Sequence, residues 1–390
     1  MIPPRRPRTE YASLLDLLLG AAALLAVVLL PLLHGGGFRG TLPNVTLYVC
    51  IYVILGLGLN VVVGFTGLLD LGYVAFLATG ALLTGFLLRM TTTPDGVLHW
   101  RVTEPPPADA SPLLGFDGSY LLVLLASGIA CALLGVLRGI PTLRVRGDYY
   151  AIMTLGFAEI LFETALWDRS YPVDMESVTG GTFGVKLSSL HVPRLFGRQL
   201  FYDEPVFYYL VVGVVVATFV AVHHVNRSRF GRALASIRLD ETAARACGVD
   251  VARHKLAAFA ISGFVGGVGG SLYALNYGTV AAKGLDVWQS VLILCGVVLG
   301  GMGSIRGAAF GVGALMALGE LLREDLGGVS VPPEARFLIY GLLLIVVMRF
   351  RPQGLLPPVR HGRPVTWERD ALLAAETPLC SLPAPAEERA

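Results

Sequence analysis

The chain has 390 residues, of which 54% are apolar and only 15% are charged, and its formal net charge at pH 7 is +2. A soluble domain carries about 25% charged residues because its surface must be solvated, so this composition excludes an ordinary soluble protein. The small net charge gives no reason to expect a nucleic-acid partner. Five scattered cysteines form no C-x-x-C pair, so neither a metal site nor a disulfide framework is predicted.

Apolar segments recur along most of the chain at lengths suited to a bilayer. Crossing the hydrocarbon takes about 20 mostly apolar residues, and helices satisfy their own backbone hydrogen bonds there. The sequence therefore predicts an all-α, polytopic transmembrane bundle of about ten helices. The predicted spans are 13–33, 45–63, 71–90, 119–140, 149–167, 205–225, 256–277, 287–303, 307–323 and 335–349.

Three of these spans have alternatives. The apolar run of the first exceeds the 7–15 residues of a signal-peptide core, so we interpret it as an uncleaved helix. Glycines separate the eighth span from the ninth, so broken or re-entrant helices are an alternative there.

The basic residues predict an orientation with both chain ends in the cytoplasm. With the N-terminus inside, 20 of the 30 Lys and Arg residues fall in inside segments or at their flanking helix ends, as the positive-inside rule requires. The predicted parts are then a cytoplasmic segment 1–12, a transmembrane domain 13–349 and a cytoplasmic disordered tail 350–390. Segments 91–118 and 168–204 become external loops.

Segment 226–255 is too polar to span the membrane, yet it has a helical pattern. Its apolar residues suggest short amphipathic turns with arginines on the other face, and Gly248 is expected to end the second turn. Such a segment suits insertion of its apolar face into a groove of a partner protein. The alternative is an ordinary positive-inside loop with a surface helix, which composition alone favours.

Ionisable residues within predicted spans are candidate functional groups, because they are costly in a membrane. Asp148 is best explained as a helix cap, whereas Asp70 fits a cap and a transport role equally. Glu159 lies about two turns into its helix, so we expect it in the solute pathway or in a buried pair with an arginine. Glu163 lies on the same face, and Glu320 is a further candidate.

Polar and aromatic neighbours complete the predicted pathway. Tyr73 and Tyr149 could supply hydroxyls to a polar solute, with aromatic packing as the alternative. The predicted pathway residues are Asn60, Asp70, Tyr73, Tyr149, Thr154 and Glu159.

Segment 226–255 resembles the cytoplasmic loop by which permeases of ABC-type importers dock on their ATPase subunits. Glu241, Ala243, Ala244 and Gly248 follow a variant of that loop's Glu-Ala-Ala…Gly motif. Residues 228–233 (Ser-Arg-Phe-Gly-Arg-Ala) and 255–259 (Lys-Leu-Ala-Ala-Phe) resemble one subfamily in particular. This is the branched-chain amino-acid permease family, whose relatives carry urea or short amides.

Further motifs of that family follow in order and extend the resemblance over roughly residues 56–356. They lie at 58–60, 67–76, 146–160, 179–184, 300–304 and 351–355. Phe183 stands where an asparagine is common in the family. The chain is thereby identified as a member of the larger of that family's two permease subunit types.

The resemblance implies a type-II-like importer permease fold in the plasma (inner) membrane and transport of Leu, Ile, Val or a related small polar solute. It implies a second permease subunit, two ATP-binding cassette subunits and an extracytoplasmic solute-binding protein as partners. The residues that it assigns to the ATPase-coupling loop are Phe230, Gly231, Arg232, Ile237, Arg238, Glu241, Ala243, Ala244 and Gly248.

No enzymatic activity and no cofactor are expected of the chain itself. It carries no P-loop, so ATP would be bound and hydrolysed by the partner subunits. The alternative function is an ion-coupled secondary transporter in which Asp70 and Glu159 bind Na⁺ or protons. A membrane-embedded enzyme is a second alternative, against which the lack of clustered metal ligands argues.

Overall fold

The computed structural model describes residues 41–89, 91–92, 98–99, 111–112, 118–143, 145, 149–167, 184–187, 194–195, 198–200, 205–281, 286–323 and 332–356. The predicted first span at 13–33, the tail beyond 356, Asp148 and residues 179–183 lie outside these ranges.

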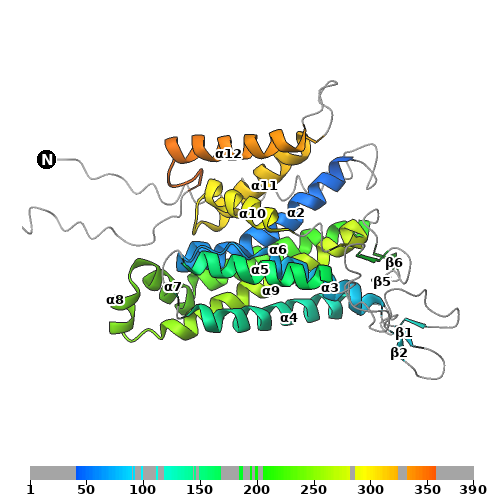
Figure 1. Ribbon diagram of the computed structural model, residues 1–390, viewed down its shortest axis with the longest axis horizontal. Helices are drawn as coiled ribbons and strands as arrows, with labels where there is room; N and C mark the ends of the chain where they lie inside the picture. The colour runs from blue at the N-terminus through cyan, green and yellow to red at the C-terminus, as the bar shows by residue number, and fades with distance from the viewer. Residues whose placement is uncertain are drawn as a thin grey trace, which may run out of the picture. The chain divides into compact units, whose positions relative to one another are not determined.

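The described chain is a bundle of helices (Figure 1). The helices are α2 (Thr41–Asn60), continued by the π-helix η2 (Val61–Thr66), α3 (Val74–Arg89), α4 (Ser119–Thr142), α5 (Tyr149–Trp167), α6 (Pro205–Arg227), α7 (Arg229–Leu239), α8 (Glu241–Ala246), α9 (Val251–Tyr277), α10 (Val287–Gly300), α11 (Ile305–Leu321) and α12 (Pro333–Phe350).

Every predicted span after the first therefore corresponds to one helix, which confirms the all-α, polytopic fold class. Five of the described helices are long and apolar enough to cross a membrane: α2 with η2, α4, α5, α6 and α9. Helices α3 and α10 are shorter apolar helices. The glycine-rich region after Gly300 is a turn between two helices, α10 and α11.

The strands that the structure describes are two residues long and lie in the connections between helices. β1 (Thr91–Thr92) pairs with β2 (Leu98–His99) and β3 (Ser111–Pro112), and β5 (Arg194–Leu195) pairs with β6 (Arg198–Gln199). β4 (Val185–Lys186) pairs with β7 (Thr279–Val280), with Val185 opposite Val280. Figure 1 shows the labelled strands at one end of the bundle, away from α7 and α8. We call these two ends the strand end and the α7–α8 end.

Helix α9 packs against α2, α3 and α4 through glycines. A side-chain carbon on Gly267 would lie 2.5 Å from the Ser127 carbonyl oxygen of α4, and one on Gly270 would overlap with the Leu77 carbonyl of α3. Lipid tails are as apolar as the helices, so close backbone contact and dispersion hold such a bundle together. The glycines of α9 therefore position the helices that carry the sites described below.

The connections predicted to be inside the cell come together at the α7–α8 end. Arg238 of α7 contacts residue 64, the turn after α10 contacts Asn60, and the chain after α12 contacts Gly300. At the C-terminal part of α4, Gly139 lies against Leu256 near the start of α9. The helices thus run up and down between the two ends as the predicted topology requires.

Candidate functional site

Segment 226–255 forms two short helices, each started by a side-chain cap. The Ser228 hydroxyl accepts a hydrogen bond from Gly231 N at 3.2 Å, and the Asp240 carboxylate accepts from Thr242 N at 2.7 Å. Such caps satisfy N–H groups that have no partner within the helix. Gly248 follows α8 with a φ of 82°, in the left-handed region that glycine adopts without strain. The predicted helical turns and the terminating glycine are confirmed.

The apolar face of α7 and α8 packs on the chain's own bundle, which corrects the prediction that it inserts into a partner. Leu234, Ile237 and Ala244 are buried in one cluster with Leu57 and Phe65 of α2 and η2. The neighbouring end of α2 and η2 offers an apolar surface that the side chains of α7 and α8 can reach. Burial there removes the loop's side chains from water without the entropic cost of association.

The outward surface of the loop is mostly polar, with one large apolar exception. Leu239, the last residue of α7, is 88% exposed. Arg232, Ala243 and Gly248 are also exposed. This surface, and not the buried face, is available to a partner protein.

Two other predicted loop residues, Gly231 and Phe230, hold the loop in shape. Gly231 is buried against the end of α6, and any side chain there would overlap with carbonyl groups of that helix. Phe230 stacks on His254 of α9 with ring centroids 5.5 Å apart. The loop is therefore attached at both its α6 and α9 sides.

Glu241 connects α8 to α9. Its carboxylate accepts hydrogen bonds from Lys255 Nζ at 2.9 Å and from Arg245 Nη2 at 2.6 Å. Partial burial raises the pKa of Glu241, but the hydrogen bond and charge of Lys255, together with Arg245, outweigh it and bring the pKa below its ordinary value. The group is thus held as a carboxylate.

Arg238 connects the loop to the π-helical end of α2. Its guanidinium Nη1 donates to the Gly64 carbonyl of η2, and its aliphatic stem lies over Gly67, whose φ is 77°. Carbonyl groups near a helix C-terminus lack partners within the helix, so a guanidinium is well suited to this position. A side-chain carbon on Gly303 would lie 2.7 Å from the same Nη1, so Arg238 also borders the α10–α11 turn.

Asn60 joins α2 to the α10–α11 turn at the same place. Its Oδ1 accepts from Gly303 N at 2.9 Å, and its Nδ2 donates to the Ser304 carbonyl at 3.4 Å. The chain after α12 closes the assembly, because Leu355 N donates to the Leu299 carbonyl and Leu356 N to the Gly300 carbonyl, both at 2.9 Å. Motifs far apart in sequence thus meet next to the loop.

Asp70 forms a buried ion pair with Arg138 of α4, a partner that sequence reasoning missed. The two oxygens accept from Arg138 Nη2 at 2.5 Å and Nη1 at 3.1 Å, and Oδ1 also accepts from Gly72 N at 2.9 Å. The guanidinium lies 4.4 Å from the Phe76 ring centroid. An arginine within an apolar span was the available signal for this pair. Any transport role of Asp70 requires this pair to open.

The other predicted pathway residues fall into two groups. Tyr73 and Thr154 are buried, with the Tyr73 hydroxyl donating to the Ser262 carbonyl at 3.3 Å and Thr154 Oγ1 accepting from Leu71 N at 3.2 Å. Tyr149 and Glu159 are exposed on α5. Buried Asn60 and Asp70 belong with the first group, so four of the six residues are buried and two are exposed. Their transport roles stay predictions.

The sequence matches one family of known proteins over most of its length. Residues 41–348 match the family described as "Branched-chain amino acid transport system / permease component". The high-affinity branched-chain amino acid transport system permease protein LivM of Escherichia coli is 35% identical over 344 residues, which cover 83% of this chain and 71% of the relative.

More distant relatives are also permeases. The probable branched-chain amino acid transport permease protein LivM of Methanocaldococcus jannaschii is 24% identical over 331 residues, covering 80% of this chain and 92% of the relative. The fructose import permease protein FrcC of Rhizobium meliloti is 25% identical over 236 residues, which cover 58% of this chain and 61% of the relative. No solved structure gives a significant match.

Proposed function

The chain belongs to the branched-chain amino acid transport system permease family, and on that basis we propose that it is the membrane-spanning subunit of an ABC importer for Leu, Ile, Val or a closely related solute. The subunit provides the membrane path and moves when partner ATPase subunits bind and hydrolyse ATP. The family match favours this function over an ion-coupled secondary transporter.

The contact of Arg238 with η2 is the observation that carries the coupling mechanism. A force on α7 acts directly on the Gly64 carbonyl, and through Asn60 on the α10–α11 turn. The π-helix is a local irregularity of the kind found at functional sites, so it is a suitable place for α2 to bend. Docking of an ATPase subunit on the exposed surface around Leu239 would then move three spanning helices together.

The exposed face of α5 supports a second permease subunit as partner. Glu159 and Glu163 are exposed there, and no ion pair to either carboxylate is found among the described residues. Placing a charged group of a spanning helix against lipid costs much free energy, so such a group faces protein or a water-filled path. Gly156, with open space around its Cα, would let a neighbouring helix approach closely. A second permease subunit covering this face would place Glu159 in the path, where the sequence predicts it.

The charge of the α7–α8 end supports its cytoplasmic location. Its basic residues include Arg227, Arg229, Arg232, Arg245 and Arg349, as the positive-inside rule expects of cytoplasmic connections. The strand end then faces outward, towards an extracytoplasmic solute-binding protein, in the plasma (inner) membrane.

A docking variant tests this function directly. Leu239→Glu places a charge at the exposed centre of the loop surface without touching the buried cluster, and we expect loss of ATPase co-purification with a normally folded chain. Arg323→Gln, at an exposed site of the strand end and outside the loop, is the control and should retain the ATPase. Retention of the ATPase by Leu239→Glu would contradict docking at this surface.

A coupling variant tests the mechanism separately. Arg238→Gln keeps the aliphatic stem but removes the guanidinium that bonds Gly64. The assay uses proteoliposomes that hold the complete importer. We expect ATP hydrolysis to continue while solute uptake per ATP falls at least about tenfold, because the variant loses a hydrogen bond made by a charged group. Unchanged uptake per ATP would show that this contact does not transmit motion.

A further inference from the structure

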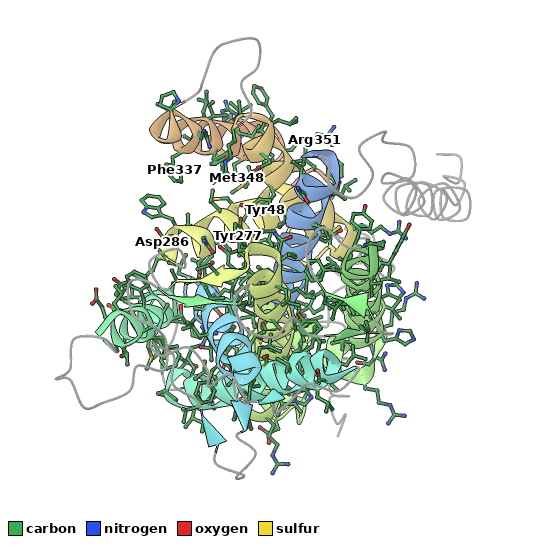
Figure 2. All side chains as sticks on the ribbon, turned by 90° about the vertical axis from the view of Figure 1, so that its right-hand side faces the viewer. Tyr48, Tyr277, Asp286, Phe337, Met348 and Arg351 are labelled. Carbon is green, nitrogen blue, oxygen red and sulfur yellow. The ribbon has the colours of Figure 1, made fainter. Side chains whose placement is uncertain are left out.

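A cleft at the strand end lies between four helices. It has a volume of about 180 Å³ and is lined by α2 (Tyr48), α10 (Leu292), α11 (Met316, Glu320) and α12 (Tyr340). Figure 2 looks at this end of the bundle and labels Tyr48 on α2 and Phe337 on α12. The cleft is far from the coupling residues, and none of the roles assigned above uses it.

Three charged residues line this cleft, Glu320, Arg323 and Arg336. Glu320 and Arg336 each have the same sign as the helix end that carries them. Glu320 is in the last turn of α11, where the helix dipole is negative, and Arg336 is in the first turn of α12, where it is positive. Stability alone favours the opposite arrangement, with acidic groups at N-termini and basic groups at C-termini. Glu320 and Arg336 therefore place an acidic and a basic group on different helices of the cleft.

The Glu320 carboxylate is only weakly neutralised by its neighbour. Arg323 Nη1 lies 3.6 Å from Glu320 Oε1, beyond ordinary hydrogen-bond distance, and Arg323 is 64% exposed. A compact ammonium group in the cleft could approach the carboxylate more closely. Both arginines line the cleft and can offer N–H groups to a carboxylate.

The remaining walls suit an aliphatic side chain. Leu292 and Met316 provide an apolar surface, and methionine adapts to irregular shapes. Tyr340 reaches into the space left by Gly319, where any side-chain carbon would overlap with its hydroxyl. Trp288 and Phe337, with ring centroids 5.4 Å apart, add to the aromatic residues of this end, which is typical of a membrane–water interface.

We propose that this cleft is a receiving site for a zwitterionic amino acid with an aliphatic side chain, with its ammonium group at Glu320, its carboxylate at Arg336 and its side chain against Leu292 and Met316. The volume is of the order of a single free leucine molecule. This site rests on the proposed function, because it names where the subunit first holds its solute. α10, which forms one wall, also packs against α5 and α12.

Photolabelling of the complete importer without its solute-binding protein tests the site. The probe is photo-leucine, a diazirine analogue that keeps both charges, and labelled peptides are identified by mass spectrometry. We expect labelling of the peptides that contain Met316 or Tyr340, and competition by leucine. 4-Methylpentanoate and 3-methylbutylamine, each lacking one charge, should compete at least about tenfold less well, since a hydrogen bond to a charged group is lost.

Variants complete the test. Glu320→Gln and Arg336→Gln should each lower this labelling at least about tenfold, whereas Arg349→Gln, at the other end of α12, should label like the wild type. Normal labelling in both cleft variants, or labelling only elsewhere, would overturn the proposal. If the wild-type importer transports leucine in either of those cases, the proposed function stands without this site. If the wild type transports no amino acid, the proposed function itself fails.

Discussion

Two charged clusters lie at opposite ends of the bundle and are built in opposite ways. Asp70 and Arg138, towards the α7–α8 end, are 0% and 2% exposed and form a bidentate pair at 2.5 and 3.1 Å. Glu320 and Arg323, at the strand end, are 24% and 64% exposed and lie 3.6 Å apart. A closed pair fixes helices relative to one another, whereas an open cluster keeps its charges available for a solute.

The largest effect is expected from opening the closed pair. Arg138→Met leaves the Asp70 carboxylate buried without its partner, which costs about 3–5 kcal/mol of stability. The melting temperature of the purified protein in detergent should fall strongly.

The double variant Asp70→Asn with Arg138→Met is the control for this prediction. Asparagine still accepts from Gly72 N, and no unpaired charge remains, so its melting temperature should lie nearer to the wild type than that of Arg138→Met. A single variant that melts like the wild type would show that the pair has no structural role.

A pair of glycine variants compares the packing around α10 with that around α12. A side chain on Gly300 would overlap with the Gly307 carbonyl, whereas Gly341 of α12 has open space around it. Gly300→Ala should therefore destabilise the protein by about 1–3 kcal/mol. Gly341→Ala should be neutral or slightly stabilising, because alanine favours helices. Equal melting temperatures for the two variants would contradict the difference in packing.

The pH dependence of the coupling loop gives a smaller effect. The pKa of Glu241 is lowered in the folded chain by Lys255 and Arg245. Its contribution to the free energy of unfolding is therefore present above the unfolded pKa of about 4.3 and is lost as the pH falls through the lower folded value. The carboxylate is partly exposed, so we expect this contribution to the free energy of unfolding to be less than about 1 kcal/mol.

The measurement for this prediction compares the melting temperatures of the wild type and Glu241→Gln. Their difference should be constant between pH 8 and about pH 5 and should shrink below about pH 4.3. A difference that grows on acidification would mean that the sign of this linkage is wrong. Lys255→Gln should cost more than Arg245→Gln, because Arg245 is the more exposed partner.

The smallest effect on stability is expected at the open cluster. Arg323→Gln removes a long, exposed contact and should change the free energy of unfolding by less than about 0.5 kcal/mol. Equilibrium unfolding or thermal melting in detergent measures it. If Arg323→Gln destabilised the protein as strongly as Arg138→Met, the strand-end cluster would be structural, and the contrast between the two ends would fail.

Much of the fold could be predicted because a bilayer imposes length and polarity on each span. The spans expected at 119–140 and 149–167 correspond to α4 (Ser119–Thr142) and α5 (Tyr149–Trp167). Gly248 was expected to end a helical turn and does so. The orientation of the loop's apolar face was predicted wrongly, because amphipathic periodicity shows that a face is buried but not against what.

The sequence by itself determined the helices from α2 to α12, the loop between α6 and α9 and the family. These depend on local properties: run length, charge placement and short motifs. Only the tertiary structure decided that Asp70 meets Arg138, that Arg238 meets Gly64, and that Glu320 and Arg336 face one cleft. Each of these contacts joins residues on different helices, and their proximity depends on how the glycine-lined helices pack, which no single span encodes.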